Sequence, residues 1–192
     1  MACADKLGFL VRGTLVFDDE EQSSALMDYC IYDGWNGEHN AVSRFLEEKP
    51  YPPDSDETTL LQAMSKARYS LYQVQSVAAG VGVNCLDILR GDGGSIIDVG
   101  LGTTAVPGLA LAARLLTLPD FAMTTGASLP VDADALVAIR DSLEGGPVEM
   151  GKVDYNRLSR QQQAMMSSVM IRAVLEKGAS SRIGYGGAVR RQ

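Results

Sequence analysis

A glycine-rich segment near the middle of the chain has the residue types and spacing of a phosphate-binding loop. Gly100, Gly102 and Ala105 match the pattern G-x-G-x-x-A. They follow a strand-like run that ends at Val99. Glycines in this pattern let backbone amides approach a pyrophosphate, and the N-terminus of a following helix stabilises its charge. Asp120 stands near the spacing of a carboxylate that binds ribose hydroxyls, so a dinucleotide site is one hypothesis.

The same segment resembles two other ligand-binding loops. Residues 98–102 (DVGLG) resemble the first motif of S-adenosylmethionine-dependent methyltransferases, with Thr104 where a third glycine is usual. The run DVGLGTT is also similar to the phosphate loop of actin-like ATPases. A nucleotide- or S-adenosylmethionine-dependent enzyme that uses residues 100–105 is therefore the alternative hypothesis. Its binding residues would be Asp98, Gly100, Gly102, Ala105 and Asp120.

The sequence around this segment favours a purely structural interpretation. A doubly wound nucleotide-binding sheet needs several βα units, but only one short strand and then two helices are indicated after Asp120. Residues 69–89 lack the intervening helices that parallel strands require. Pro119 would also fall within a central strand, which does not tolerate proline. We therefore favour a glycine-rich turn between two strands of one sheet.

No catalytic residue is assigned from the sequence. No serine lies in a G-x-S-x-G nucleophile elbow. Asp87 and Asp98 are flanked by hydrophobic residues in strand-like sequence, and semi-buried carboxylates often have shifted pKa values and sometimes a function. The favoured interpretation is that each lies on a polar strand face or accepts hydrogen bonds from a turn. The single histidine, His39, lies among polar residues and is expected at the surface.

The cysteines and the apolar runs indicate where the protein is located and whether it holds a metal or a cofactor. Cys3, Cys30 and Cys85 have apolar surroundings and are expected to be reduced, structural thiols of a cytoplasmic protein. Three cysteines and one histidine are too few and too scattered for a usual zinc site, so we expect no metal and no cofactor. Residues 105–118 are interrupted by a proline and an arginine and are too short to span a bilayer.

The charge of the chain bears on its partners. The formal net charge is −7, with 17 basic and 24 acidic residues, which repels a phosphodiester backbone. Small barrels often bind oligonucleotides, but interleaved aromatic and arginine residues are missing from the strand-rich part. A protein partner is therefore expected, with no nucleic acid and no membrane.

The pattern predicts one α+β domain over residues 1–178 and a flexible tail over residues 179–192. The expected fold is a small, mainly antiparallel sheet or partial barrel in the middle, flanked by N-terminal and C-terminal helices. Three parts follow from the periodicity: a helical part over residues 20–68, a strand-rich core over 69–130 and a helical part over 131–178.

Several individual elements are indicated. Asp56 is predicted as the N-cap of one helix and Asp132 as that of another, and Ser159 with Gln162 has capping-box spacing. The methionine-rich face of that last helix is expected to pack onto the same domain, the alternative being a docking surface. Strands are expected over residues 8–17, 69–77, 85–89, 95–101 and 121–125, whereas residues 109–118 fit helix or buried strand.

Four segments together resemble an uncharacterised bacterial domain that often occurs in proteins carrying SEC-C-type zinc-chelating motifs. The segments are residues 69–74 (YSLYQV), 86–91 (LDILRG), 98–101 (DVGL) and 112–115 (AARL). The region over residues 28–48 is similar to the segment that precedes this domain. The resemblance implies no established activity, and without a cysteine-rich cluster zinc is not carried over. The expected function is a non-catalytic interaction or scaffold domain.

Overall fold

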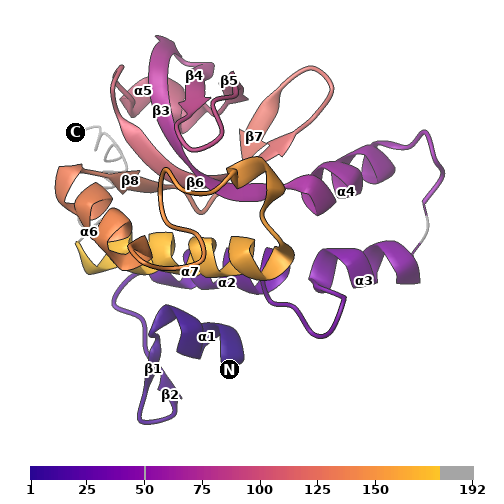
Figure 1. The fold of residues 1–192 in the computed structure, drawn as a ribbon. Coiled ribbons are helices and arrows are strands. Elements are labelled where there is room, and N and C mark those ends of the chain that lie inside the picture. Colours follow the sequence, from indigo (N-terminus) through magenta and orange to yellow (C-terminus); the bar gives the residue numbers. More distant parts are fainter. Residues whose placement is uncertain (50, 178–192) are drawn as a thin grey trace, which may run out of the picture.

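A closed β-barrel stands on a layer of helices in the computed structural model, which describes residues 1–49 and 51–177 (Figure 1). The flexible tail predicted over residues 179–192 lies outside the described residues. The barrel strands are β3 (Arg68–Ala78), β4 (Gly82–Asp87), β5 (Gly93–Ile97), β6 (Ala110–Thr117) and β7 (Ala122–Thr124).

The strand pairing defines the type of barrel. The strands follow the order β3-β4-β5-β7-β6, and β6 pairs back onto β3, which closes the barrel. All these pairings are antiparallel except that of β5 with β7, which is parallel. The helix α5 (Val99–Thr104) joins β5 to β6. Five strands in this order, with a helix between the third and the fourth, have the topology of the OB-fold, a small Greek-key barrel.

The long strand β3 makes closure of the barrel possible because it pairs with two strands, β4 and β6. Its residues from Arg68 to Gln73 pair with β6, and those from Tyr72 to Ala78 pair with β4. A bulge between Val74 and Ser76 bends the strand between these two roles. The barrel interior is filled by alternating side chains of all five strands, among them Tyr72, Val74, Val83, Cys85, Ile96, Leu111, Ala113 and Ala122.

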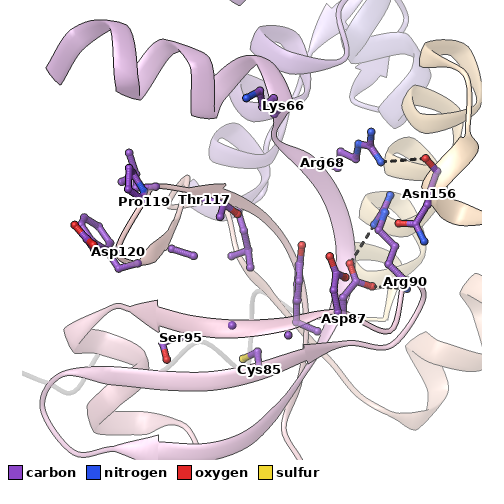
Figure 2. A pocket seen from close by; sticks show the side chains of 18 residues that line it. Lys66, Arg68, Cys85, Asp87, Arg90, Ser95, Thr117, Pro119, Asp120 and Asn156 are labelled. Carbon is purple, nitrogen blue, oxygen red and sulfur yellow. Dashed lines mark hydrogen bonds and ion pairs between the residues drawn. The ribbon is translucent and has the colours of Figure 1, made fainter. Parts of the chain in front are cut away.

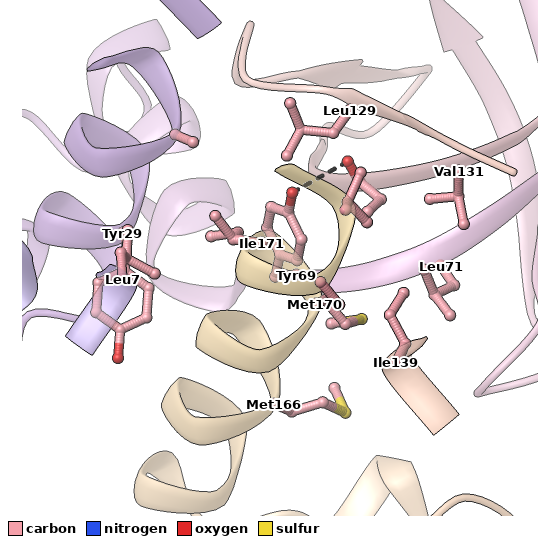
Figure 3. Close-up of a cluster of buried hydrophobic side chains, with 14 of the residues drawn as sticks. Leu7, Tyr29, Tyr69, Leu71, Leu129, Val131, Ile139, Met166, Met170 and Ile171 are labelled. Carbon is pink, nitrogen blue, oxygen red and sulfur yellow. Dashed lines mark hydrogen bonds between the residues drawn. The ribbon is translucent and has the colours of Figure 1, made fainter. Parts of the chain in front are cut away.

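A second and larger core lies between the barrel and the helices. A sixth strand, β8 (Leu129–Val131), pairs with the start of β6 and leads directly into α6 (Ala133–Leu143). The helices α1 (Ala2–Leu7), α2 (Glu20–Tyr32) and α7 (Arg160–Glu176) complete this core. Figure 3 shows Met166 and Met170 of α7 among the buried side chains of the barrel and of α6. The methionine face therefore packs onto the same domain, as predicted.

The remaining elements are short or peripheral. They are β1 (Leu10–Val11), β2 (Thr14–Leu15), α3 (Ala41–Glu48), α4 (Asp56–Lys66) and the 3-10 turn η1 (Tyr155–Arg157). The helix α4 leads into β3, and α3 lies next to α4 in Figure 1.

The fold class predicted from the sequence is confirmed, and several details are corrected. Residues 99–104 form a short helix instead of the expected turn, and the Asp98 side chain caps it at the Leu101 amide. The strand expected over residues 95–101 therefore ends at Ile97. Of the two alternatives left open for residues 109–118, the structure shows a strand, β6, over Ala110–Thr117. The strand expected over residues 8–17 is replaced by a hairpin of two two-residue strands. The N-cap of α4 is Ser55 and not Asp56, whereas the caps Asp132 and Ser159 are confirmed.

Candidate functional site

The structure brings four of the five predicted cofactor-binding residues together on α5. Asp98 is the N-cap, and its Oδ1 accepts a hydrogen bond from the Leu101 amide at 2.9 Å. Gly100 and Gly102 lie within the helix, and Ala105 is its C-cap. Asp120 lies in the turn between β6 and β7 and lines a different cavity.

Gly102 has a packing role that explains its residue type. The Gly80 amide donates a hydrogen bond to the Gly102 carbonyl at 3.1 Å. A Cβ at Gly102 would lie 2.6 Å from the Gly82 nitrogen and 2.9 Å from the Val81 nitrogen, both of them backbone atoms. Only glycine therefore allows α5 to lie this close to the turn between β3 and β4.

The cavity beside α5 has the wrong charge for a phosphate. Its volume is about 460 Å³, and Glu20, Glu21 and Asp98 contribute three carboxylates to its wall. Among the described residues that line it, none is lysine, arginine or histidine. Phosphate groups would be repelled here by the wall and would meet no cation.

A different cavity opens into the mouth of the barrel. The strands β5 and β7 pair only at Ile96 and Ala122, and beyond this pair the barrel wall is open. The opening, which we name the barrel cleft, has a volume of about 520 Å³ (Figure 2). It is lined by Lys66, Arg68, Tyr72, Cys85, Asp87, Arg90, Asp92, Gly93, Gly94, Ser95, Leu115, Thr117, Leu118, Pro119, Asp120, Phe121, Ala122 and Asn156.

Asp87 forms the polar centre of the barrel cleft, and it is fully engaged. Its Oδ1 accepts hydrogen bonds from Ser70 Oγ at 2.8 Å and from the amides of Leu89 and Arg90 at 2.9 and 3.0 Å. Its Oδ2 pairs with Arg90 Nη1 at 3.2 Å. Asp87 therefore closes the turn after β4, which agrees with the interpretation that it accepts hydrogen bonds from a turn.

Arg90 is the least satisfied charged group in the barrel cleft. Only 5% of its side chain is exposed. Its Nη1 binds Asp87, but Nε and Nη2 are buried and find no hydrogen-bond partner among the described residues. A buried guanidinium with two unpaired donors is uncommon, because each such donor loses its water without a replacement.

The rest of the barrel cleft combines exposed charges with an apolar floor. The exposed charged residues of the lining are Lys66, Arg68, Asp92 and Asp120. Together with the buried Asp87–Arg90 pair they make three cations and three anions, so the charges of the lining balance. Tyr72, Cys85 and Leu115 form the floor.

Two groups of this floor hold their protons near neutral pH. Burial raises the pKa of the Cys85 thiol to about 11. Burial and the neighbouring Asp87 also raise the pKa of Tyr72. Neither group is activated as a nucleophile or a base under physiological conditions.

A second buried charge cluster joins the barrel to α2. Arg114 of β6 donates to Asp28 Oδ2 at 3.0 Å, to Asp33 Oδ2 and to the Ala67 carbonyl at 3.3 Å. Its guanidinium lies 4.5 Å from the Tyr32 ring centroid. Burial raises the pKa of Asp28, and Arg114 opposes this rise. Burial lowers the pKa of Arg114, but Asp33 and Asp28 outweigh burial, so the pKa of Arg114 is raised. We name these residues the Arg114 cluster.

The cysteines and the histidine are not arranged for catalysis. Burial, and next the adjacent Cys3 thiol, raise the pKa of Cys30 to about 11. His39 is half exposed and contacts Glu47 at 3.2 Å. Within residues 1–49 and 51–177, no three His, Cys, Asp or Glu side chains are grouped as metal ligands would be. The helices of this described part are also too short or too polar to cross a bilayer.

Sequence reasoning missed both buried arginines, although one left a signal. Arg114 is a lone charge within a run of apolar residues, which indicates a buried ion pair. Arg90 opens a glycine-rich turn and gives no such signal, since its burial depends on the folding of the barrel around it.

A closed five-stranded barrel with a lateral cleft, packed on helices, defines the class of this protein. The chain belongs to the family of unknown function DUF7986, whose model matches residues 1–146. The match contains the whole barrel and the helices up to α6, and α7 lies beyond it. No curated protein and no solved structure matches the chain.

Proposed function

We propose that this protein is a non-catalytic binding domain whose barrel cleft receives part of a protein partner. The observation that carries the proposal is the cleft itself. It opens directly onto the apolar interior of the barrel through the gap between β5 and β7, beside the buried and incompletely bonded Arg90. By analogy of fold alone, small barrels of this topology bind oligonucleotides and oligosaccharides on the face of the second and third strands and in the adjoining loops, so the analogy supports a binding role and not the class of partner.

The bonding of the candidate catalytic groups supports a binding role. Asp87 closes a turn, Asp98 caps a helix, and Asp28 and Asp33 hold Arg114. The raised pKa values of Cys30 and Cys85 keep both thiols protonated near neutral pH. Each of these side chains has a structural reason for its place, which leaves none that needs a reaction to explain it.

The charge of the barrel cleft favours a protein over a nucleic acid. Its cations, Lys66, Arg68 and Arg90, are matched by three carboxylates, and the chain carries a net charge of −7. Binding of nucleic acid depends on a local excess of cations that releases counterions from the backbone. A protein segment with apolar and charged side chains suits a cleft with an apolar floor and balanced charges.

The alternative function is a nucleotide- or S-adenosylmethionine-dependent enzyme that uses residues 100–105. The cavity beside α5 favours it by position, and the three carboxylates of that cavity disfavour it. A thermal-shift panel with dinucleotides, ATP and S-adenosylmethionine distinguishes the two proposals. A ligand at a hundred times its dissociation constant would stabilise the protein by roughly 2.7 kcal/mol, and we expect no such shift.

Site-specific photo-crosslinking in the native cells tests the proposed function. A photoreactive phenylalanine analogue replaces Ser95, which is exposed in the barrel cleft, and in a matched control it replaces Arg140, which is exposed on α6. We expect one discrete protein adduct from position 95 alone, identified by mass spectrometry and then reproduced with the two purified proteins. Equal labelling from both positions, or no adduct from position 95, would contradict the proposal.

We infer a cytoplasmic location from the three free thiols, and a bacterial origin and a SEC-C-associated context from the resemblance of the sequence. Residues 1–178 would form a single domain, which is supported by the shared core of α1, α7 and the barrel.

A further inference from the structure

One edge of the Arg90 guanidinium has no hydrogen-bond partner among the described residues. Its Nη1 pairs with Asp87 on one side, whereas Nε and Nη2 lie together on the other side of the planar guanidinium. These two nitrogens donate in parallel, at the spacing of the two oxygens of a carboxylate. Figure 2 shows Arg90 on the wall of the barrel cleft, beside Asp87 and across from Pro119 and Asp120.

An unpaired, buried guanidinium edge calls for a partner. Burial removes water from both donors, and Asp87 cannot serve them because its oxygens already bind Ser70, two amides and Arg90 Nη1. A buried polar group that stays unsatisfied in a native fold needs an explanation, such as strain, a functional role, or an ordered water or ion.

We propose that the barrel cleft binds a carboxylate side chain of a partner peptide on the Nε and Nη2 edge of Arg90, an inference that rests on the proposed function. An apolar side chain next to that carboxylate packs on the floor formed by Tyr72 and Leu115 and against the exposed Phe121. The partner segment is therefore an Asp or Glu flanked by hydrophobic residues.

The number of donors on the Arg90 edge favours a carboxylate over a phosphate. Asp92 and Asp120 are exposed at its rim and oppose any anion. The two donors of the Arg90 edge match the two oxygens of a carboxylate, whereas the remaining charged oxygens of a phosphate find no donor on this edge.

The ligand must displace the groups that cover the Arg90 nitrogens. Arg68 is exposed, and its one contact with the Asn156 carbonyl, at 3.5 Å, is at the limit of a hydrogen bond. Figure 2 shows Arg68, Asn156 and Arg90 on the same side of the cleft. A change of the Arg68 rotamer therefore breaks no strong hydrogen bond.

An NMR titration of the full chain tests this inference. The probe is the capped peptide acetyl-Phe-Glu-Phe-amide, and acetyl-Phe-Gln-Phe-amide is its neutral match. We expect the Nε–H resonance of Arg90 to move on titration with the Glu peptide, and the Gln peptide to bind at least tenfold more weakly. Equal binding of the two peptides, or an unmoved Arg90 resonance, would overturn the inference.

Variants and a phosphate arm complete the test. Arg90→Met is expected to abolish the preference for Glu, and Arg90→Lys to reduce it severalfold because lysine lacks the two parallel donors. Arg140→Met, at an exposed arginine on α6, is the control that should leave the preference unchanged. If Arg90→Met does not fold, the Arg90→Lys variant decides. Tighter binding of acetyl-Phe-phosphoserine-Phe-amide than of the Glu peptide would also overturn the carboxylate assignment.

The two proposals fail in distinguishable ways. A cross-linked partner from position 95, together with equal binding of the Glu and Gln peptides, would reject only the role of Arg90. A Glu preference that depends on Arg90, together with no cross-linked protein, would reject only the protein partner.

Discussion

Two arginines are buried in or beside the barrel wall, and their surroundings differ. Arg114 is 2% exposed and donates from Nε, Nη1 and Nη2, with the Tyr32 and Tyr69 rings against its guanidinium. Arg90 is 5% exposed and donates from Nη1 alone. Arg114 joins β6 to α2 through its three bonded nitrogens, whereas Arg90 keeps two donors without a partner, which we propose that a ligand binds.

The strongest test of this comparison is Arg114→Met. It leaves Asp28 and Asp33 buried without their cation, so we expect the free energy of unfolding to fall by about 3–5 kcal/mol. Urea denaturation followed by circular dichroism measures the change, and Arg140→Met, an exposed arginine substitution, is the control. A loss of less than about 1 kcal/mol would show that the Arg114 cluster does not hold α2 to the barrel.

Gly102→Ala tests whether the glycine at this position is needed for the packing of α5 against the turn between β3 and β4. The added methyl group would meet backbone nitrogens at 2.6 and 2.9 Å, and we expect a loss of about 1–3 kcal/mol. Gly100→Ala is the matched control, since its Cβ would contact only the end of the Asp98 side chain, at 3.2 Å. Similar stability of the two variants would refute the packing role of Gly102.

Arg90→Met tests whether Arg90, unlike Arg114, contributes little to the free energy of unfolding. Asp87 keeps its bonds to Ser70 and to two amides, and the variant no longer buries two unpaired donors. We therefore expect a loss of about 1 kcal/mol or less, measured in the same denaturation experiment. A loss as large as that of Arg114→Met would mean that the two arginines play the same part.

The smallest expected effect is a pH dependence of the Arg114 cluster. Burial raises the pKa of Asp28 in the folded protein above its unfolded value of about 3.8. Between the unfolded and the folded pKa of Asp28, the folded state therefore binds more protons than the unfolded state. The contribution of Asp28 to stability is fully present below the unfolded pKa and is lost as the pH rises through the folded pKa.

Asp28→Asn removes this titration. We expect the free energy of unfolding of the wild type, relative to the variant, to increase as the pH is lowered from 7 to 4. Urea denaturation at a series of pH values measures the difference. A relative decrease over the same range would contradict the assigned direction of the pKa shift.

The sequence predicted the elements of the fold better than their closure. Alternating residues and turn signals indicate β3, β4 and β7, and side-chain caps indicate α6 and α7. Barrel closure depends on the pairing of Arg68 to Gln73 with β6, a contact between distant segments that local patterns do not encode. The helix α5 was missed because two glycines lower its propensity, while the Asp98 cap and the packing of Gly102 stabilise it.

The candidate site was predicted less well than the fold. Four of the five predicted cofactor residues do lie together, but on a helix whose cavity is acidic. All five barrel strands, the β4–β5 and β6–β7 turns, α4 and η1 contribute to the lining of the barrel cleft, and no spacing in the sequence brings these segments together. Arg90 shows its incomplete bonding only once the fold has removed it from water.

The seam between β5 and β7 rests on one residue pair, Ile96 with Ala122, whereas β3 and β4 share six pairs. Local opening follows the weakest pairing, so the free energy of opening is expected to be lowest at this seam. Backbone amides of residues 93–97 should exchange with deuterium faster than those of β3. Occupation of the cleft would slow that exchange, because a bound segment would tie the two edges together.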